Sequence, residues 1–258
     1  MIDARTRTLG LLGDPVEHTM SPLIHNTLSE KLGLNNVYVP FHTKAENLEA
    51  AVKGAHALNI LGLNVTVPHK NEVMKYLSAI DEGGQAIGAV NTLVRTENGY
   101  KGYNTDMMGL LREVRSYGVE LDGQDVIILG AGGAAKAVAY MCVSNGAGHV
   151  YILNRTVSKA QAIADHMNDF FGNQSMTAMS IQDYHKLPEK KYIVFQSTSK
   201  GLYPHSDEVV IEDPAFYKLI SVGIDLIYKP FCTGFMSLCR QAGAKSYNGL
   251  KMLLYQGI

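Results

Sequence analysis

The feature that most constrains the fold is a glycine-rich loop between an apolar run and an alanine-rich segment. Residues 125–129 read Asp-Val-Ile-Ile-Leu, and residues 130–135 continue Gly-Ala-Gly-Gly-Ala-Ala. This order matches the G-x-G-x-x-[G/A] pattern, in which the glycines allow a tight turn and close approach of the backbone to a pyrophosphate. The N–H groups that open the following helix would bind that pyrophosphate. The loop therefore predicts a dinucleotide-binding Rossmann domain, with a plain structural turn as the alternative.

The end of the next expected strand indicates which dinucleotide is bound. Residues 149–153 read as a strand and run into Asn154, Arg155 and Thr156. NAD proteins usually place an acidic residue near this point, about 20 residues after the glycines, to bind the ribose 2′-hydroxyl. An acidic residue would repel a 2′-phosphate, whereas Arg155 can pair with it and Lys159 adds charge. NADP is therefore favoured over NAD, the alternative being that Arg155 is a solvated loop residue.

The rest of the chain predicts an α/β protein of two domains. From residue 106 onward, apolar strands alternate regularly with helices, which is typical of right-handed βαβ units and a parallel sheet. The first hundred residues also alternate but end in a hairpin, because Asn98-Gly99 separates two strand-like runs. The break falls near Asn104-Thr105-Asp106. The further strands are expected at 9–13, 37–41, 62–67, 90–94, 100–103, 192–195 and 222–227. The helices are expected at 21–32, 45–58, 107–117, 134–144, 158–171, 214–219 and 233–241, with a further helical stretch that follows residue 68 and ends at Ala89.

Composition narrows the functional class. The 258 residues carry 23 Lys and Arg against 24 Asp and Glu, so a general nucleic-acid-binding surface is not expected. No apolar run reaches the length of a membrane span, and the N-terminus lacks the apolar region of a signal peptide. Three cysteines cannot form a disulfide framework, and they are expected in the core. The histidines show no metal-binding spacing, so no metal is predicted. We expect a soluble, cytoplasmic protein.

Polar residues in the first domain gather where the expected strands end. Hydroxyl, amide and ammonium groups at such positions suit a polyhydroxylated small molecule that carries a carboxylate. Each residue also has a structural alternative, because Ser21 could cap a helix, Asp106 could cap the next one, Lys70 could be solvated, and Asn91 could belong to a turn. The residues concerned are Thr19, Ser21, Asn64, Thr66, Lys70, Asn91 and Asp106.

Longer stretches of the sequence resemble the shikimate dehydrogenase family in the same order along nearly the whole chain. That order and coverage are more specific than any single motif. The stretches are GDPVEHTMSPLIHN, NVTVPHK, GAVNTL, YNTD, GAGGAAKA, NRTVSKA, DLIYKP and NGLKMLLYQ.

The resemblance implies an enzyme of aromatic amino-acid biosynthesis, an oxidoreductase that reduces 3-dehydroshikimate to shikimate with NADPH. It implies a substrate domain over residues 1–105, joined by residues 235–258 folding back, and a Rossmann NADP-binding domain over 106–234, with a cleft between them. The catalytic residues would be Lys70 and Asp106. The substrate contacts would be Thr19, Ser21, Asn64, Thr66, Asn91, Tyr228 and Gln256. The cofactor would be bound by Gly130, Ala131, Gly132, Gly133, Ala134, Asn154, Arg155, Thr156, Lys159 and Gly249.

Lys70 is the natural proton donor in such a reaction, because its ammonium can polarise the ketone and protonate the developing alkoxide. A carboxylate beside a lysine favours the charged form of that lysine. We therefore expect Lys70 and Asp106 to share the proton with the substrate as a coupled pair.

Three departures from the family pattern keep two further functions open. Thr19 stands where the family usually has Ser, Gln196 where it has Asn, and Lys251 where it has Gly. Lys251 could crowd the nicotinamide or add a favourable charge. The alternatives are an enzyme acting on quinate or a related cyclic acid, and a weakly catalytic dinucleotide-binding protein. The partner would be a small molecule, with neither nucleic acid nor membrane, and the chain a monomer or homodimer.

The C-terminus is a further difference. Relatives usually continue past the glutamine that matches Gln256 with another helix, whereas this sequence stops at Gly257-Ile258. We therefore expect Gln256 to be poorly held and the affinity for substrate to suffer.

Overall fold

The structure is a computed structural model that describes residues 2–257. The chain forms two compact units, and the boundary between them falls between Thr105 and Asp106. Each unit contains its own sheet.

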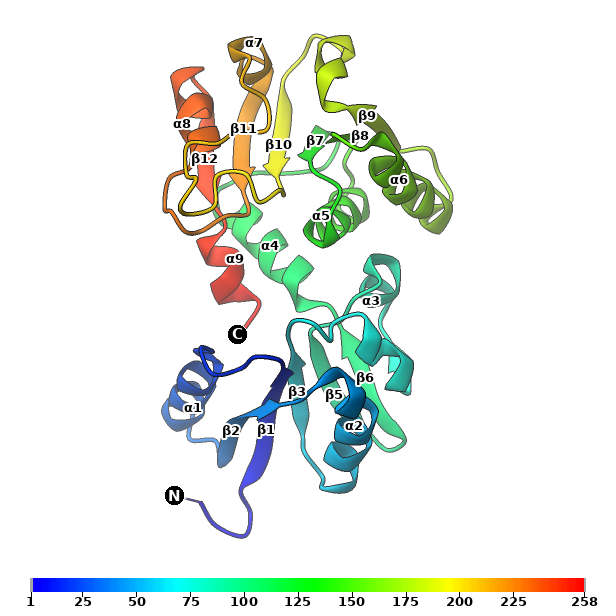
Figure 1. Cartoon of the computed structure of the whole chain (residues 1–258), viewed down its shortest axis with the longest axis vertical. Coiled ribbons are helices and arrows are strands. Elements are labelled where there is room, and N and C mark those ends of the chain that lie inside the picture. The colour runs from blue at the N-terminus through cyan, green and yellow to red at the C-terminus, as the bar shows by residue number, and fades with distance from the viewer. Residues whose placement is uncertain (1, 258) are drawn as a thin grey trace. The chain divides into compact units, whose positions relative to one another are not determined.

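The sheet of the first unit is mixed. Its strands are β1 (Arg7–Gly13), β2 (Asn36–His42), β3 (Gly62–Val65), β4 (Ala79–Ile80), β5 (Thr92–Thr96) and β6 (Gly99–Tyr103), and they lie in the order β2-β1-β3-β5-β6-β4 (Figure 1). The β2, β1 and β3 strands are parallel, whereas β5 is antiparallel to both β3 and β6. The hairpin expected around Asn98-Gly99 therefore forms the β5–β6 pair.

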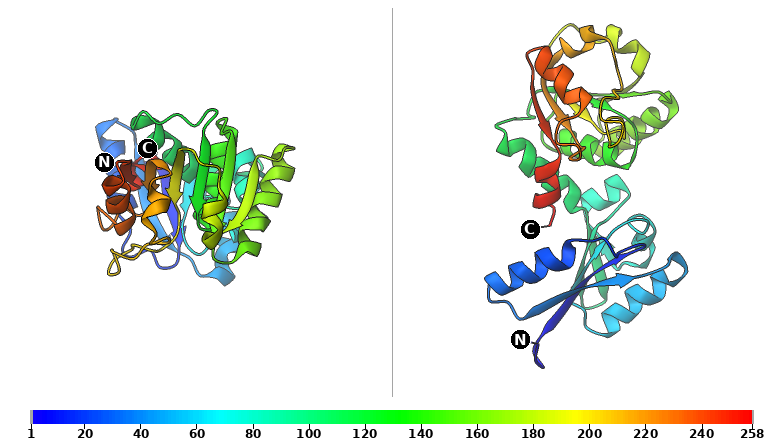
Figure 2. Two further views of the ribbon diagram at one scale, coloured as in Figure 1. Left: turned by 90° about the horizontal axis from the view of Figure 1, so that it is seen from above. Right: turned by 60° about the vertical axis from the view of Figure 1, so that its left-hand side comes forward.

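Helices cover both faces of this sheet. Successive side chains of a strand point to opposite faces, so Leu11 and Leu12 of β1 enter separate apolar clusters. The right-hand view of Figure 2 shows the longer helices, α1 (Ser21–Lys31) and α2 (Leu48–Ala57), on opposite sides of the sheet. The shorter helical segments are η1 (Ala45–Asn47), η2 (Glu72–Tyr76) and α3 (Glu82–Ile87).

The sheet of the second unit is parallel throughout. Its strands are β7 (Asp125–Leu129), β8 (His149–Asn154), β9 (Met176–Ser180), β10 (Tyr192–Gln196), β11 (Ile220–Asp225) and β12 (Lys245–Asn248). They lie in the order β12-β11-β10-β7-β8-β9 (Figure 1), which is the strand order of a Rossmann fold. The central strands β7 and β10 are buried almost along their length, which explains their continuous apolar sequences.

The helices of the second unit alternate with its strands. They are α4 (Thr105–Ser116), α5 (Gly133–Ser144), α6 (Val157–Phe171), η3 (Ile181–Lys186), α7 (Pro214–Tyr217), α8 (Gly234–Gln241) and α9 (Leu250–Tyr255). One apolar cluster joins α7 and α8 to the strands, with Phe216 and Phe235 at its centre. No helix of the described chain is long and apolar enough to cross a membrane.

Residues 235–248 lie within the second unit, where α8 packs on β11 and β12, and β12 hydrogen-bonds to β11. Three expectations differ from the structure. The edge strands β4, β9 and β12 and the helix α9 were not predicted. Ser21 is the first residue of α1 and not its cap, since Met20 precedes the helix. Cys142 and Cys239 are buried as expected, but Cys232 is exposed.

Candidate active site

The polar residues of the first unit form a hydrogen-bonded chain that crosses its sheet. The Tyr38 hydroxyl on β2 donates to Asn64 Oδ1 on β3 at 2.8 Å. Asn64 Nδ2 in turn donates to Thr92 Oγ1 on β5 at 3.2 Å. These strands are adjacent to β1 or to one another, so their side chains meet on one face of the sheet. Asn64 and its neighbours are therefore held in place before any ligand arrives.

Thr19 and Ser21 lie at one end of this chain. Thr19 Oγ1 donates to Ser21 Oγ at 3.0 Å and accepts the Ser21 backbone N–H at 3.2 Å. Burial raises the pKa of Tyr38, and a hydrogen bond with Ser21 opposes that rise. Thr19 therefore keeps its hydroxyl beside that of Ser21, although threonine carries an extra methyl group.

Asn91 lies at the other end and is almost completely buried. Its Oδ1 accepts the backbone N–H of Thr105 at 2.8 Å and the hydroxyl of Thr105 at 3.1 Å. Asn91 therefore fixes the first residue of α4. The only structural role that the sequence suggested for Asn91 was a place in a turn. Asn104 beside it donates to the carbonyl of Ala89 at 3.0 Å.

Thr66 and Lys70 follow strand β3 in the segment that leads to η2. The backbone N–H of Thr66 donates to the carbonyl of Leu12 at 2.9 Å, which anchors the end of β3 beside β1. The carbonyl of Lys70 accepts the backbone N–H of Val90 at 2.9 Å, next to Asn91. Both side chains are half-buried. Thr66 and Lys70 therefore follow the end of β3, in the same unit as Asn64.

Tyr38 is the functional candidate that sequence reasoning missed in this unit. It lies in an apolar-looking strand and is only 3% exposed. Its ring stacks on His25 with 4.3 Å between centroids, while its hydroxyl joins the polar chain. A tyrosine in a strand is usually a core residue. The role of Tyr38 in the polar chain is visible only in the sheet, where β1 pairs with both β2 and β3 and so brings Tyr38 near Asn64.

The glycine loop of the second unit has the predicted form. Gly130 ends β7 with φ +107°, a conformation that favours glycine, and a Cβ there would lie 2.7 Å from the Thr198 side chain. Gly132 and Gly133 open α5, and a Cβ at either position would meet only open space. Ala135 is fully buried where the helix packs on the sheet. The loop leaves room for a pyrophosphate at the start of α5, beside Ala131 and Ala134.

Two lysines and a histidine line a small cavity beside this loop. The cavity of about 240 Å³ is lined by Ala131, Ala162 and Ile163 together with Lys136, Lys159 and His166. Arg155 and Thr156 follow β8 and are exposed, while Asn154 Nδ2 donates to the Thr156 carbonyl at 2.8 Å and shapes the turn. No carboxylate lines the cavity among the described residues. Lys136 and His166 were not predicted, although Lys136 directly follows the glycine motif.

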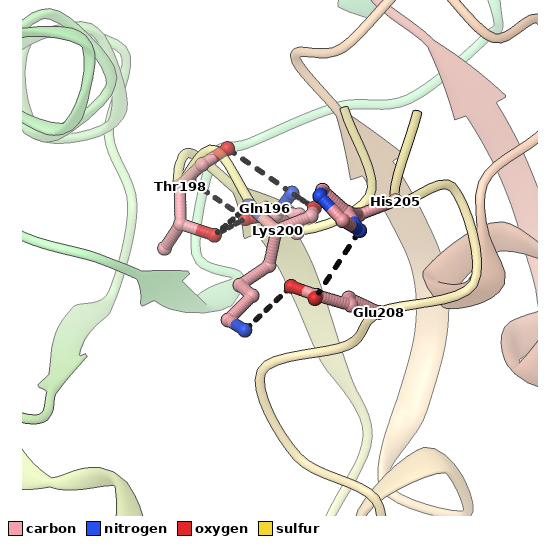
Figure 3. Close-up of polar contacts among 5 residues, drawn as sticks. All are labelled: Gln196, Thr198, Lys200, His205 and Glu208. Atoms are coloured by element: carbon pink, nitrogen blue, oxygen red, sulfur yellow. Dashed lines mark hydrogen bonds and ion pairs between the residues drawn. The ribbon is translucent and has the colours of Figure 1, made fainter. Parts of the chain in front are cut away.

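Gln196, a departure from the family pattern, organises the loop that follows β10 (Figure 3). Its Oε1 accepts the backbone N–H of Thr198 at 2.7 Å and the Thr198 hydroxyl at 2.6 Å, while its Nε2 donates to the carbonyl of Lys200 at 2.9 Å. Lys200 Nζ and His205 Nδ1 each contact the Glu208 carboxylate, at 2.6 and 3.8 Å. Gln196 is 1% exposed, so its amide acts mainly as an internal brace of the loop.

The same amide reaches a buried carboxyl group. Gln196 Nε2 lies 3.3 Å from Asp225 Oδ1 at the end of β11, and Asp225 also accepts the Ile227 backbone N–H and the Thr233 hydroxyl. Burial raises the pKa of Asp225 to about 6, and these donors oppose the rise. Tyr228 follows in the next loop with 47% of its surface exposed.

The last predicted residues lie on or beside α9. Gly249 precedes the helix, and a Cβ there would lie 2.5 Å from the Leu226 carbonyl, so only glycine fits. Lys251 Nζ donates to Ser116 Oγ at 3.0 Å. Lys251, which departs from the family pattern, therefore takes part in the contact between α4 and α9.

The backbone N–H of Gln256 donates to the Met252 carbonyl at 3.0 Å. A Cβ on Gly109 would be only 2.8 Å from the Gln256 backbone nitrogen. The Gln256 backbone thus lies against α4, and the expectation that it is poorly held stays a prediction; Ile258 lies outside the described residues.

Asp106 occupies the first turn of α4. Within residues 2–257 no group of three or more His, Cys, Asp or Glu side chains is arranged to hold a metal ion.

Comparison with known proteins identifies the family. A family model described as the shikimate dehydrogenase substrate binding domain matches residues 11–93, and one described as shikimate / quinate 5-dehydrogenase matches residues 112–214. The shikimate dehydrogenase (NADP(+)) of Caldanaerobacter subterraneus subsp. tengcongensis is 42% identical, covering 99% of this chain and 90% of its own length. That of Methanocaldococcus jannaschii is 40% identical, covering 100% and 90%.

A solved structure agrees with these sequence relatives. The crystal structure of shikimate 5-dehydrogenase from Listeria monocytogenes, in complex with shikimate and NAD, superposes with a TM-score of 0.90 at 29% identity. The match covers 99% of this chain and 90% of that one. The chain therefore belongs to the shikimate dehydrogenase family.

Proposed function

We propose that the protein catalyses the reversible, NADPH-dependent reduction of 3-dehydroshikimate to shikimate, a step of aromatic amino-acid biosynthesis. The observation that carries the proposal is the coexistence of a preorganised polar chain in one unit with a glycine loop and a lysine-lined cavity in the other. The relatives that are 40% and 42% identical over nearly the whole chain bear this activity in their names.

The residues of the second unit fit NADP(H). Open space at Gly132 and Gly133 leaves the helix N–H groups of α5 accessible to a pyrophosphate. Arg155 and Lys159 are exposed cations that would hold a 2′-phosphate, with Asn154 and Thr156 shaping the turn. Ala131, Ala134 and Gly249 would line the bound cofactor. When bound, NADPH supplies the hydride.

The polar chain of the first unit suits the substrate. Thr19 and Ser21 present hydroxyl groups suited to a carboxylate, and Asn64, Thr66 and Asn91 present amide and hydroxyl groups suited to ring hydroxyls. Tyr38 holds the Asn64 side chain in one orientation, so less conformational entropy is lost when the substrate binds. We assign two residues of the second unit, Tyr228 and Gln256, to the substrate as well.

We assign the proton transfer to Lys70. In the reducing direction its Nζ holds a proton and donates it to the carbonyl oxygen as that oxygen becomes an alkoxide. Asp106 supplies the carboxylate with which Lys70 would share the transferred proton as a coupled pair.

The test is an initial-rate assay of shikimate and quinate, each with NADP and with NAD. We expect turnover of shikimate with NADP to exceed the other three combinations. Higher turnover of quinate would assign the enzyme to that acid, because the same polar groups could bind it. Tight NADP binding without turnover of either acid would instead indicate a dinucleotide-binding protein.

We place the reaction in the cytoplasm, because three cysteines are too few and too odd in number for the disulfide framework of a secreted protein.

A further inference from the structure

Glu113 is a buried carboxyl group that the proposed chemistry does not use. It lies on α4 and has no exposed surface. Its Oε1 accepts the backbone N–H of Lys251 at 3.1 Å and the Tyr117 hydroxyl at 3.2 Å. Its Oε2 is buried and has no hydrogen-bond partner within the described residues. Burying an unpartnered carboxyl oxygen costs free energy, so a role for this residue is expected.

The contacts of Glu113 join two helices of the second unit. Glu113 on α4 accepts an N–H from the first turn of α9, and Lys251 Nζ reinforces that end by donating to Ser116 Oγ at 3.0 Å. The same ammonium lies 4.2 Å from the centre of the Tyr117 ring. The beginning of α9 is therefore attached to α4 through one buried acceptor and one cation.

The other end of α9 touches α4 one turn earlier. A Cβ at Gly109 would lie 2.8 Å from both the Gln256 nitrogen and the Met252 carbonyl oxygen, so the two backbones are in direct contact. Gly109 and Glu113 are four residues apart and share one face of α4. Gln256 caps the short helix α9 (Leu250–Tyr255). A shift of α9 at the end that contacts Glu113 would therefore also move Gln256.

We propose that Glu113 is a positioning residue that docks helix α9 on α4 and thereby fixes Gln256 for substrate binding. The inference rests on the proposed function for the role of Gln256. Asp106 lies in the first turn of α4, so the same docked pair of helices carries a residue assigned to catalysis and one assigned to substrate.

Protonation of Glu113 has a defined effect on this docking. Burial raises the pKa of Glu113 to about 7, against the opposing effect of its hydrogen bonds and of the Lys251 charge. A solvated glutamate titrates near pH 4.3. Because the docked state holds the proton more tightly, docking weakens as the pH rises through about 7. The titratable groups that interact with Glu113 are Tyr117 on α4 and Lys251 on α9. Tyr117 in turn interacts with Tyr255 on α9 and with Tyr247 on β12, which stacks on it.

The experiment compares the full-length wild type with Glu113→Gln, Glu113→Ala and the exposed control Glu120→Gln. Hydrogen exchange of residues 250–256, corrected for the intrinsic rate, is measured from about pH 6 to 8 beside the KM for shikimate and kcat. In the wild type and the control, protection should fall and KM rise with pH. Glu113→Gln mimics the protonated acid and should remove both trends. Glu113→Ala should lose protection at every pH and raise KM about 10-fold with kcat within about twofold.

The outcomes separate the two proposals. Wild-type protection in Glu113→Ala, or an unchanged pH trend in Glu113→Gln, would overturn the docking role; if the alanine variant does not fold, the glutamine variant decides. Lost protection without a change in KM would show that Glu113 docks α9 but does not position Gln256, and would also overturn the inference. If the wild type turns over no shikimate, the proposed function fails, while the exchange data still decide the docking.

Discussion

The Thr233 hydroxyl donates a hydrogen bond of 2.6 Å to Asp225 Oδ2 in the interior of the second unit. Thr233 caps α8, and Asp225 ends β11, so this bond joins the helix to the sheet at the carboxyl end of the strand. Asp225 is also bonded to Gln196, which braces the loop after β10. One buried carboxyl group therefore holds two loops that follow neighbouring strands.

Removing the donor of this bond should destabilise the protein. Thr233→Val replaces the hydroxyl by a methyl group of similar size and leaves Asp225 Oδ2 without its partner. We expect the free energy of unfolding to fall by about 1 to 3 kcal/mol, measured by urea denaturation. Thr233→Ser keeps the hydroxyl and should cost less. Equal losses in both variants would assign the effect to packing.

Asp225 should make stability depend on pH in a defined direction. Folding raises its pKa from 3.8 to about 6, so the native state binds the proton more tightly than the unfolded chain. Its stabilising effect is complete below pH 4 and is lost as the pH rises through about 6, by up to about 3 kcal/mol. Asp225→Asn should remove this contribution. The curve of unfolding free energy against pH should then be flatter between pH 4 and 6 than that of the wild type, and parallel curves would contradict the assignment.

Lys70 should be required for turnover more than for binding. Lys70→Ala should lower kcat by about 100- to 10,000-fold with a much smaller change in KM for shikimate. Lys70→Arg keeps the positive charge but cannot release a proton near neutral pH, so it should also be inactive. Steady-state kinetics test both variants. Substantial kcat in Lys70→Arg would show that charge, and not proton transfer, is what Lys70 contributes.

Arg155 should determine the preference for NADP. Arg155→Ala should lower kcat/KM for NADP by about 10- to 100-fold, because a charge-assisted hydrogen bond to the 2′-phosphate is lost. The kcat/KM for NAD serves as the internal control, since NAD lacks that phosphate, and should change little. A parallel fall with both cofactors would place Arg155 outside the 2′-phosphate site.

Tyr38→Phe should weaken substrate binding through Asn64. The substitution removes the hydroxyl bonded to Asn64 Oδ1 and keeps the ring stacked on His25. We expect KM for shikimate to rise about 5-fold with kcat nearly unchanged. Tyr100→Phe is the matched control, because the buried Tyr100 hydroxyl donates to the Ile60 carbonyl and not to the polar chain. An effect on KM only in the control would contradict this role for Tyr38.

The sequence by itself determined most of the local elements and the Rossmann class of the dinucleotide-binding domain. Burial and backbone conformation produce apolar runs and periodicities that can be read directly from the sequence. These local patterns include the buried strand β7, the glycine loop and the alternation of strands with helices. The edge strands β9 and β12 escaped prediction because half-exposed strands such as Met176–Ser180 lack a continuous apolar run.

Only the tertiary structure decided which polar side chains act on one another. Glu113 reads as an ordinary helical glutamate until the fold brings it to Lys251, 138 positions away. Tyr38 reads as a strand residue until its hydroxyl meets Asn64, 26 positions away. Hydrogen bonds require a match of distance and direction that residue type and spacing do not encode, so the supporting contacts of the candidate site emerged only when the strands and helices had been assembled.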